Sequence, residues 1–210
     1  MEIIGYSERG AMNALFYGIA IKDNKEAMKV FLNSLNINGL DVENYCDFKM
    51  YMEFSLSDFG DPDLVIIADT KDDKKEAFFV EAKVSHRGTF SLEKQILDHN
   101  EYCGFDNREP NDKRYDTSNL FFQLRLKELF FETKGQINRD NDKHDDRIKC
   151  KKLQTTKFRV IGENEIVNRF ADEIKDCKKA YYIAIIPEQS KDIIPNTNNT
   201  YGFDIHFITW

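Results

Sequence analysis

Residues 57–84, SDFGDPDLVIIADTKDDKKEAFFVEAKV, contain two short apolar runs separated by a charged segment. The first run, Leu64–Ala68, begins directly after Pro62-Asp63, and the second is Ala77–Val80. Apolar runs of this length bounded by turn-forming residues predict β-strands, and the charged residues between them fit a hairpin connection. The stretch therefore predicts two neighbouring antiparallel strands.

The second strand continues into Glu81-Ala82-Lys83, which brings charge into a segment rich in Phe and Val. Because side chains alternate along a strand, Glu81 and Lys83 share one face, roughly 7 Å apart. Burying a carboxylate and an ammonium at such a place costs on the order of several kcal/mol of desolvation, unless a group of opposite charge compensates each of them. A hard divalent cation held by Asp63 and Glu81 is one such compensator.

Pro62-Asp63 followed by Glu81-Ala82-Lys83 resembles the motif of the PD-(D/E)XK nuclease superfamily. The resemblance implies a restriction-endonuclease-like α/β core, in which a central mixed β-sheet is flanked by helices. It further implies that Asp63 and Glu81 ligate Mg²⁺ or Mn²⁺ with help from the Ala82 backbone carbonyl. Lys83 would position or activate the attacking water, in a metal-dependent hydrolysis of phosphodiester bonds.

Other interpretations of the same residues stay open. Asp63 can be a turn residue, and Glu81 and Lys83 can form an ion pair on the solvated face of an edge strand. The chain can also be a nuclease-fold module that binds nucleic acid or regulates without turnover, or an unrelated α/β protein with structural charges. Convergence of the three side chains in one cleft would exclude the last of these.

The composition indicates one globular domain spanning residues 1–210, with 41% hydrophobic and 32% charged residues. The formal net charge of −7 means that any nucleic-acid binding must depend on local basic patches. No signal peptide or bilayer-spanning run is present, so we expect a cytoplasmic protein that does not associate with membranes. The four cysteines lack metal-ligand spacing and are expected to be free thiols: Cys46, Cys103, Cys150 and Cys177.

The N-terminal part predicts two helices and a strand before the motif. Ser7 as a cap starts the first helix near Glu8, and the second runs from about Lys25 to Asn38-Gly39. Residues 48–54 alternate as a strand. An acid in a first helical turn complements the helix dipole, and PD-(D/E)XK proteins also bring a helix glutamate to the metal, so Glu8 has both explanations. The predicted order, a helix followed by three strands, agrees with the opening order of the restriction-endonuclease-like core that the motif implies.

After the motif, His86 and Arg87 can hold a phosphate or form a solvated turn. Helices are expected at 91–102, 119–131 and 163–178, followed by strands at 180–186 and 203–210. The first of these helices carries His99, expected at the surface or half-buried. The second is strongly apolar and should pack across the sheet; its Gln123 and Lys127, four residues apart, share a face and are candidates for nucleic-acid contact.

Residues 134–159 form a basic loop or insertion, with nine Lys or Arg against four Asp. Basic segments supply non-specific affinity for phosphate backbones, although charge runs are also common in solvated loops. Lys149, Lys151 and Lys152 are the densest cluster and the candidates for this contact. Nucleic acid, with DNA favoured over RNA, is the expected partner; the oligomeric state stays open, a homodimer included.

Overall fold

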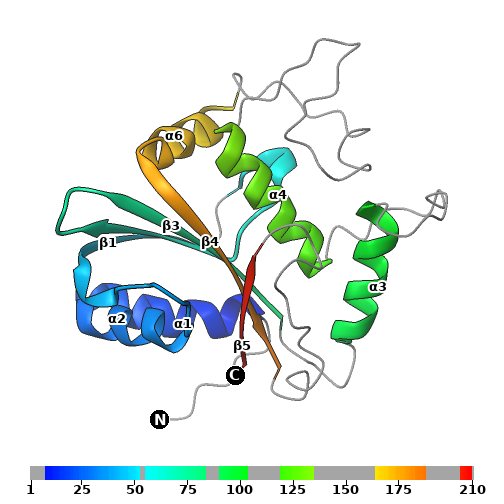
Figure 1. Cartoon of the computed structure of the whole chain (residues 1–210), viewed down its shortest axis with the longest axis horizontal. Helices are drawn as coiled ribbons and strands as arrows, with labels where there is room; N and C mark the ends of the chain where they lie inside the picture. Colours follow the sequence, from blue (N-terminus) through cyan, green and yellow to red (C-terminus); the bar gives the residue numbers. More distant parts are fainter. Residues whose placement is uncertain are drawn as a thin grey trace.

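The computed structural model describes residues 8–52, 55–83, 90–103, 119–134, 164–187 and 204–209. They form an α/β fold in which one five-stranded mixed sheet, ordered β1-β2-β3-β4-β5, is covered by helices on both faces (Figure 1). This arrangement confirms the expected class, a mixed sheet flanked by helices. No helix within the described ranges is long and apolar enough to cross a bilayer.

The first three strands form an antiparallel meander: β1 Tyr45–Met52, β2 Leu64–Thr70 and β3 Lys75–Ala82. The predicted hairpin is confirmed, and its turn is closed by a hydrogen bond of 2.8 Å from the Thr70 N–H to the Lys74 carbonyl. β1 starts earlier than the predicted residue 48, because Tyr45 already pairs with Thr70 of β2. The meander makes β1 one edge of the sheet and puts β3 at its centre.

The last two strands, β4 Cys177–Ile186 and β5 Ile205–Thr209, run parallel to β3. β4 pairs with β3 over eight positions, from Lys75 with Cys177 to Ala82 with Ile185. β3 is therefore hydrogen-bonded on both sides and covered on both faces, which explains why its apolar run is continuous.

α1 Glu8–Ile21 and α2 Lys25–Ser34 cover one face of the sheet. Their inward side chains pack on alternate residues of the strands: Met12, Phe16, Met28 and Leu32 against Leu64, Ile66, Phe78 and Val80. The predicted start of α1 at Glu8 is confirmed, while Ser7 lies outside the described residues. α2 ends at Ser34 rather than at Asn38-Gly39, because Asn36 adopts a left-handed conformation with φ of 49°.

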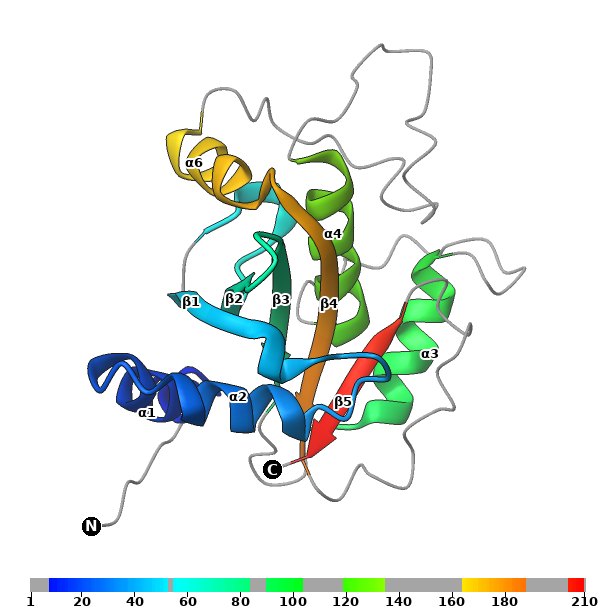
Figure 2. The same ribbon diagram turned by 60° about the vertical axis from the view of Figure 1, so that its left-hand side comes forward.

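The opposite face is covered by α3 Leu92–Cys103, α4 Leu120–Thr133 and α6 Glu165–Ile174. Figure 2 shows α4 and α6 on the side of the sheet away from α1 and α2. Asparagine side chains cap two of these helices: Asn119 accepts from the Phe122 N–H and Asn164 from the Val167 N–H. α4 packs across β3 and β4 as its composition predicted, and nearly all of its residues are buried.

His99 is the clearest disagreement with the sequence-based expectation. We expected it at the surface or half-buried, but it is fully buried at the contact between α3 and α4, with its ring 5.6 Å from that of Phe121. Helical periodicity put His99 at the same spacing as Leu92 and Ile96, on one face of the helix. It could not show that the start of α4 closes over that face, where Gln95 accepts from the Leu120 N–H.

Candidate functional site

The structure brings Asp63 and Glu81 together at one end of the β2–β3 pair. Leu64 pairs with Val80, so Asp63, one residue before β2, lies across from Glu81. Asp63 Oδ2 accepts a hydrogen bond of 2.8 Å from the Ala82 N–H. The Asp63 carboxylate therefore replaces a backbone carbonyl as the hydrogen-bond acceptor for the last N–H of β3. The two acids of the motif lie across from each other on adjacent strands.

Glu81 points into the core beneath α4. Alternation along β3 places it on the same face as Ala77 and Phe79, and its side chain is 1% exposed. Because β3 is the central strand, Glu81 is not part of a solvated edge. Its Oε1 lies 3.0 Å from Nζ of Lys127 on α4.

The electrostatics of Glu81 are those of a carboxylate that lacks full compensation. Its pKa is raised to about 7, chiefly because burial penalises the charged form; Lys127 opposes this shift and the negative charge of Asp63 adds to it. The contact of Oε1 with Lys127 is an ion pair outside hydrogen-bond geometry, since this buried oxygen has no hydrogen-bond partner among the described residues. Added positive charge would therefore stabilise the ionised form of Glu81.

Lys83 follows β3 directly and marks the more open end of the site. Its N–H donates to the Ile185 carbonyl at 2.8 Å, which fixes its backbone beside the end of β4. Its side chain is half-exposed, like that of Asp63, and its charge lowers the pKa of Glu81. Asp63 and Lys83 are therefore the more exposed charges of the site, and Glu81 is the buried one.

α4 runs over β3 in a regular register that places a further candidate residue. The Phe131 ring lies 6.4 Å from that of Phe79, and Lys127 lies against Glu81, so four helical residues match two strand residues. Gln123, one turn before Lys127 on the same face of α4, therefore lies in the direction of the end of β3. Gln123 is half-buried, and its Oε1 has no hydrogen-bond partner among the described residues.

Lys127 has a different place from the one expected. As a candidate for nucleic-acid contact it should reach solvent, but its side chain is 0% exposed and its ammonium lies against Glu81. Sequence reasoning missed this partnership. The available signal was a lysine on a strongly apolar helix, where a buried charge requires a partner.

Other predicted site residues fall where the structure gives no side-chain position. Glu8 is the first residue of α1, as predicted, but its side chain is outside the described residues. His86 and Arg87 lie outside them entirely, as do Lys149, Lys151, Lys152 and nearly all of the basic segment. Their proposed roles stay predictions.

The donor set of the site fits a hard divalent cation. Asp63 and Glu81 supply carboxylate oxygens, and magnesium sites commonly use one or two carboxylates completed by waters and substrate phosphate. Within the described ranges no group of three His, Cys, Asp or Glu residues could hold a metal. The raised pKa of the buried Glu81 carboxylate shows that added positive charge, such as a divalent ion would supply, would stabilise its ionised form.

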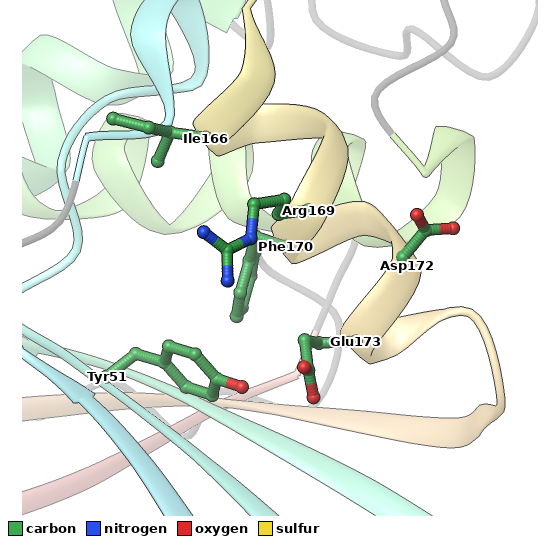
Figure 3. A pocket seen from close by; sticks show the side chains of 6 residues that line it. All are labelled: Tyr51, Ile166, Arg169, Phe170, Asp172 and Glu173. Atoms are coloured by element: carbon green, nitrogen blue, oxygen red, sulfur yellow. The ribbon is translucent and has the colours of Figure 1, made fainter.

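A separate pocket of about 390 Å³ opens between the β1 edge and α6 (Figure 3). Tyr51 and Phe170 form its aromatic walls, with ring centroids 5.1 Å apart, and Arg169 extends over it. Glu173 at one end is tied to Lys49 by an ion pair of 2.9 Å. Neither Asp63 nor Glu81 lines this pocket, so it is distinct from the carboxylate site.

No protein-family model matches the chain, and no curated protein or solved structure matches it either. We therefore infer function from the geometry of the carboxylates and lysines of the site. That geometry gives two acids on adjacent strands, one buried lysine and one half-exposed lysine.

Proposed function

We propose that this chain is a metal-dependent nuclease of the PD-(D/E)XK type that hydrolyses phosphodiester bonds, with DNA as its preferred substrate. The observation that carries the proposal is that Asp63, which accepts from the Ala82 N–H, lies across from Glu81 on the adjacent strand, with Lys83 directly after β3. These residues, drawn from two strands, have the chemistry that phosphodiester hydrolysis needs: hard ligands for a divalent ion and a cation for the phosphate.

The order of elements supports a restriction-endonuclease-like core. A helix precedes a three-stranded antiparallel meander, and after further helices β4 returns parallel to β3. The motif residues lie at the start of β2 and the end of β3, the positions that the resemblance implies. An unrelated α/β protein has no reason to place both acids across from each other on adjacent strands.

The residues have separate roles in this proposal. Asp63 and Glu81 would hold Mg²⁺ or Mn²⁺ through their carboxylates, with the Ala82 carbonyl as a further ligand. When bound, the ion would polarise the phosphate as a Lewis acid and would lower the pKa of a water molecule that it coordinates. Lys83 orients the phosphate from the open end of the site and stabilises the negative charge that develops in the transition state.

Substrate binding would depend on local positive charge, since the whole chain carries −7. The segment 134–159 contributes +5, from nine Lys or Arg and four Asp, and is the candidate contact for the phosphate backbone. Gln123, on the same face of α4 as Lys127, is a further candidate contact for the substrate. We place this activity in the cytoplasm, where thiols such as those of Cys46 and Cys177 stay reduced.

One observation favours a second candidate, a nuclease-fold module that binds nucleic acid without cleaving it. Glu81 is 1% exposed and already paired with a buried lysine, as in a site that has exchanged a metal for a permanent counter-ion. The completeness of the Asp63, Glu81 and Lys83 set supports the enzyme instead, because a binding module gains nothing from keeping all three.

Cleavage of a mixed panel of single- and double-stranded DNA and RNA, resolved on gels with Mg²⁺ or Mn²⁺, tests the proposal. Wild type should cut at least one substrate, and Asp63→Asn from a parallel preparation should not. If both proteins cut equally, the activity belongs to a contaminant or to other residues. If neither cuts but wild type binds nucleic acid, the binding module is the correct function.

A further inference from the structure

Lys127 is the most deeply buried charge of the site. Its side chain is 0% exposed on a helix whose neighbouring residues are Leu, Phe and other buried groups. Burial of an ammonium is unfavourable unless it is paired and hydrogen-bonded. Lys127 meets both conditions, because Nζ lies 3.0 Å from Glu81 Oε1 and donates a hydrogen bond of 3.1 Å to the Phe59 carbonyl.

The backbone beside the ammonium is shaped to leave room for it. Phe59 ends the short helix η2, Ser57–Phe59, and Gly60 follows with φ of 74°. A methyl group on Gly60 would lie 2.9 Å from Lys127 Nζ, closer than such contacts occur in proteins. β3, α4 and the segment that leads into Asp63 therefore meet at this one ammonium.

We propose that Lys127 is a positioning residue for the metal site. Its ion pair with Oε1 fixes the Glu81 carboxylate and leaves the second carboxylate oxygen for the divalent ion shared with Asp63. Its hydrogen bond to Phe59 holds the segment that carries Asp63 at the same point. This inference rests on the proposed function, because it assigns Lys127 a part in binding the metal of that site.

The two lysines near Glu81 have opposite expected effects on metal affinity. Either ammonium repels a divalent cation, so loss of charge alone should tighten metal binding. A residue that orients a metal-ligating side chain has the opposite effect, because it strengthens metal binding. Its removal typically weakens metal affinity about 10–100-fold. Lys127 is buried and its ammonium contacts Glu81 Oε1, so it belongs to the second kind, whereas Lys83 is half-exposed and follows the end of β3.

Calorimetric titration of Mn²⁺ and Mg²⁺ into wild type, Lys127→Met and Lys83→Met separates the two effects. Lys127→Met should bind about 10–100-fold more weakly than wild type, and Lys83→Met should bind as tightly or more tightly. Leu129→Ala serves as a control for damage to α4, since Leu129 is buried on that helix. It should keep wild-type metal affinity.

A second pair of variants tests the same point while retaining the lysine. In Gly60→Ala the new methyl group pushes on the Lys127 ammonium. Gly39→Ala is the control, because Gly39 also has a positive φ, 78°, but no atom lies within 4 Å of a methyl group added there. Metal affinity should fall in Gly60→Ala and stay unchanged in Gly39→Ala. This pair decides the question if Lys127→Met does not fold.

The outcomes distinguish the inference from the function on which it rests. If wild type binds neither ion, the metal site and this role of Lys127 fail together. If wild type binds the metal and Lys127→Met binds it equally or more tightly, the positioning role is overturned. Where Lys127→Met does not fold, the same result for Gly60→Ala overturns it. The proposed nuclease site then stands without it.

Discussion

The ammonium of Lys127 and the carboxylate of Glu81 form an ion pair, with 3.0 Å between Nζ and Oε1, in which neither side chain reaches solvent. It joins the centre of the sheet to the helix that crosses it. A pair of this kind is costly to break, because the remaining partner is left as an uncompensated buried charge.

The pair should show strong coupling in a double-mutant cycle. Lys127→Met or Glu81→Gln alone should lower the free energy of unfolding by about 3–5 kcal/mol, as for removal of one partner of a buried pair. The double variant should be more stable than the sum of the two losses implies, by about 1–3 kcal/mol of coupling. Urea denaturation in metal-free buffer measures this; additive losses would mean that the contact is not energetically significant.

Metal binding should stabilise the folded chain through Asp63. A ligand at 100 times its Kd adds about 2.7 kcal/mol, which for a chain of this size raises Tm by about 5–10 °C. Asp63→Asn should remove that rise, although its amide oxygen can still accept from the Ala82 N–H. Asp61→Asn, at an exposed acid two residues earlier, is the matched control and should keep the full rise.

Loss of the Lys83 ammonium should affect chemistry rather than binding. Lys83→Ala should leave metal and nucleic-acid affinity near wild type, while cleavage falls by orders of magnitude, because the charge that it stabilises develops only in the transition state. Single-turnover cleavage measured alongside binding isotherms separates the two quantities. Lys71→Ala, at an exposed lysine of the β2–β3 turn, should cleave like wild type; equal rates for both variants would remove Lys83 from the mechanism.

Neutralisation of the basic segment should weaken nucleic-acid binding and reduce its salt dependence. Replacement of Lys149, Lys151 and Lys152 by Ala should lower the slope of log K against log salt by about 2–3 units, since each lost phosphate contact removes close to one. Fluorescence anisotropy at several salt concentrations measures it. A control replaces three exposed lysines elsewhere and should change the slope less: Lys22, Lys71 and Lys178. Equal slopes would make the segment a solvated loop.

His99 should make stability fall in acid. Its pKa is lowered to about 3 by burial, with the charge of Arg125 on α4 acting in the same direction. The unfolded chain therefore binds a proton below about pH 6.5 that the folded chain does not take up until about pH 3. Stability rises with pH across this window, and the loss between pH 7.5 and pH 5 should be about 2 kcal/mol.

His99→Phe keeps a ring against Phe121 and removes the titration. Urea unfolding at several pH values should therefore show a shallower acid loss in this variant than in wild type. Parallel curves for the two proteins would show that His99 does not remain neutral in the folded state.

The sequence by itself predicted the order of the elements and the faces on which their side chains lie. Periodicity and turn residues located the β2–β3 hairpin, the apolar helix α4 and the shared face of Glu81 and Lys83. These features are local, because alternation, capping and turn chemistry involve residues only a few positions apart. The meeting of Asp63 with Glu81 followed from the same reasoning, since the hairpin register brings them together.

Only the tertiary structure decided which distant groups touch. Periodicity placed Lys127 and His99 on helical faces, but not against Glu81 and Phe121. Those contacts depend on where α4 crosses β3 and where α3 packs on α4, and packing of many side chains at once sets both positions. For the same reason the sequence pointed Lys127 toward nucleic acid, whereas the folded chain turns its charge inward to the carboxylate of Glu81.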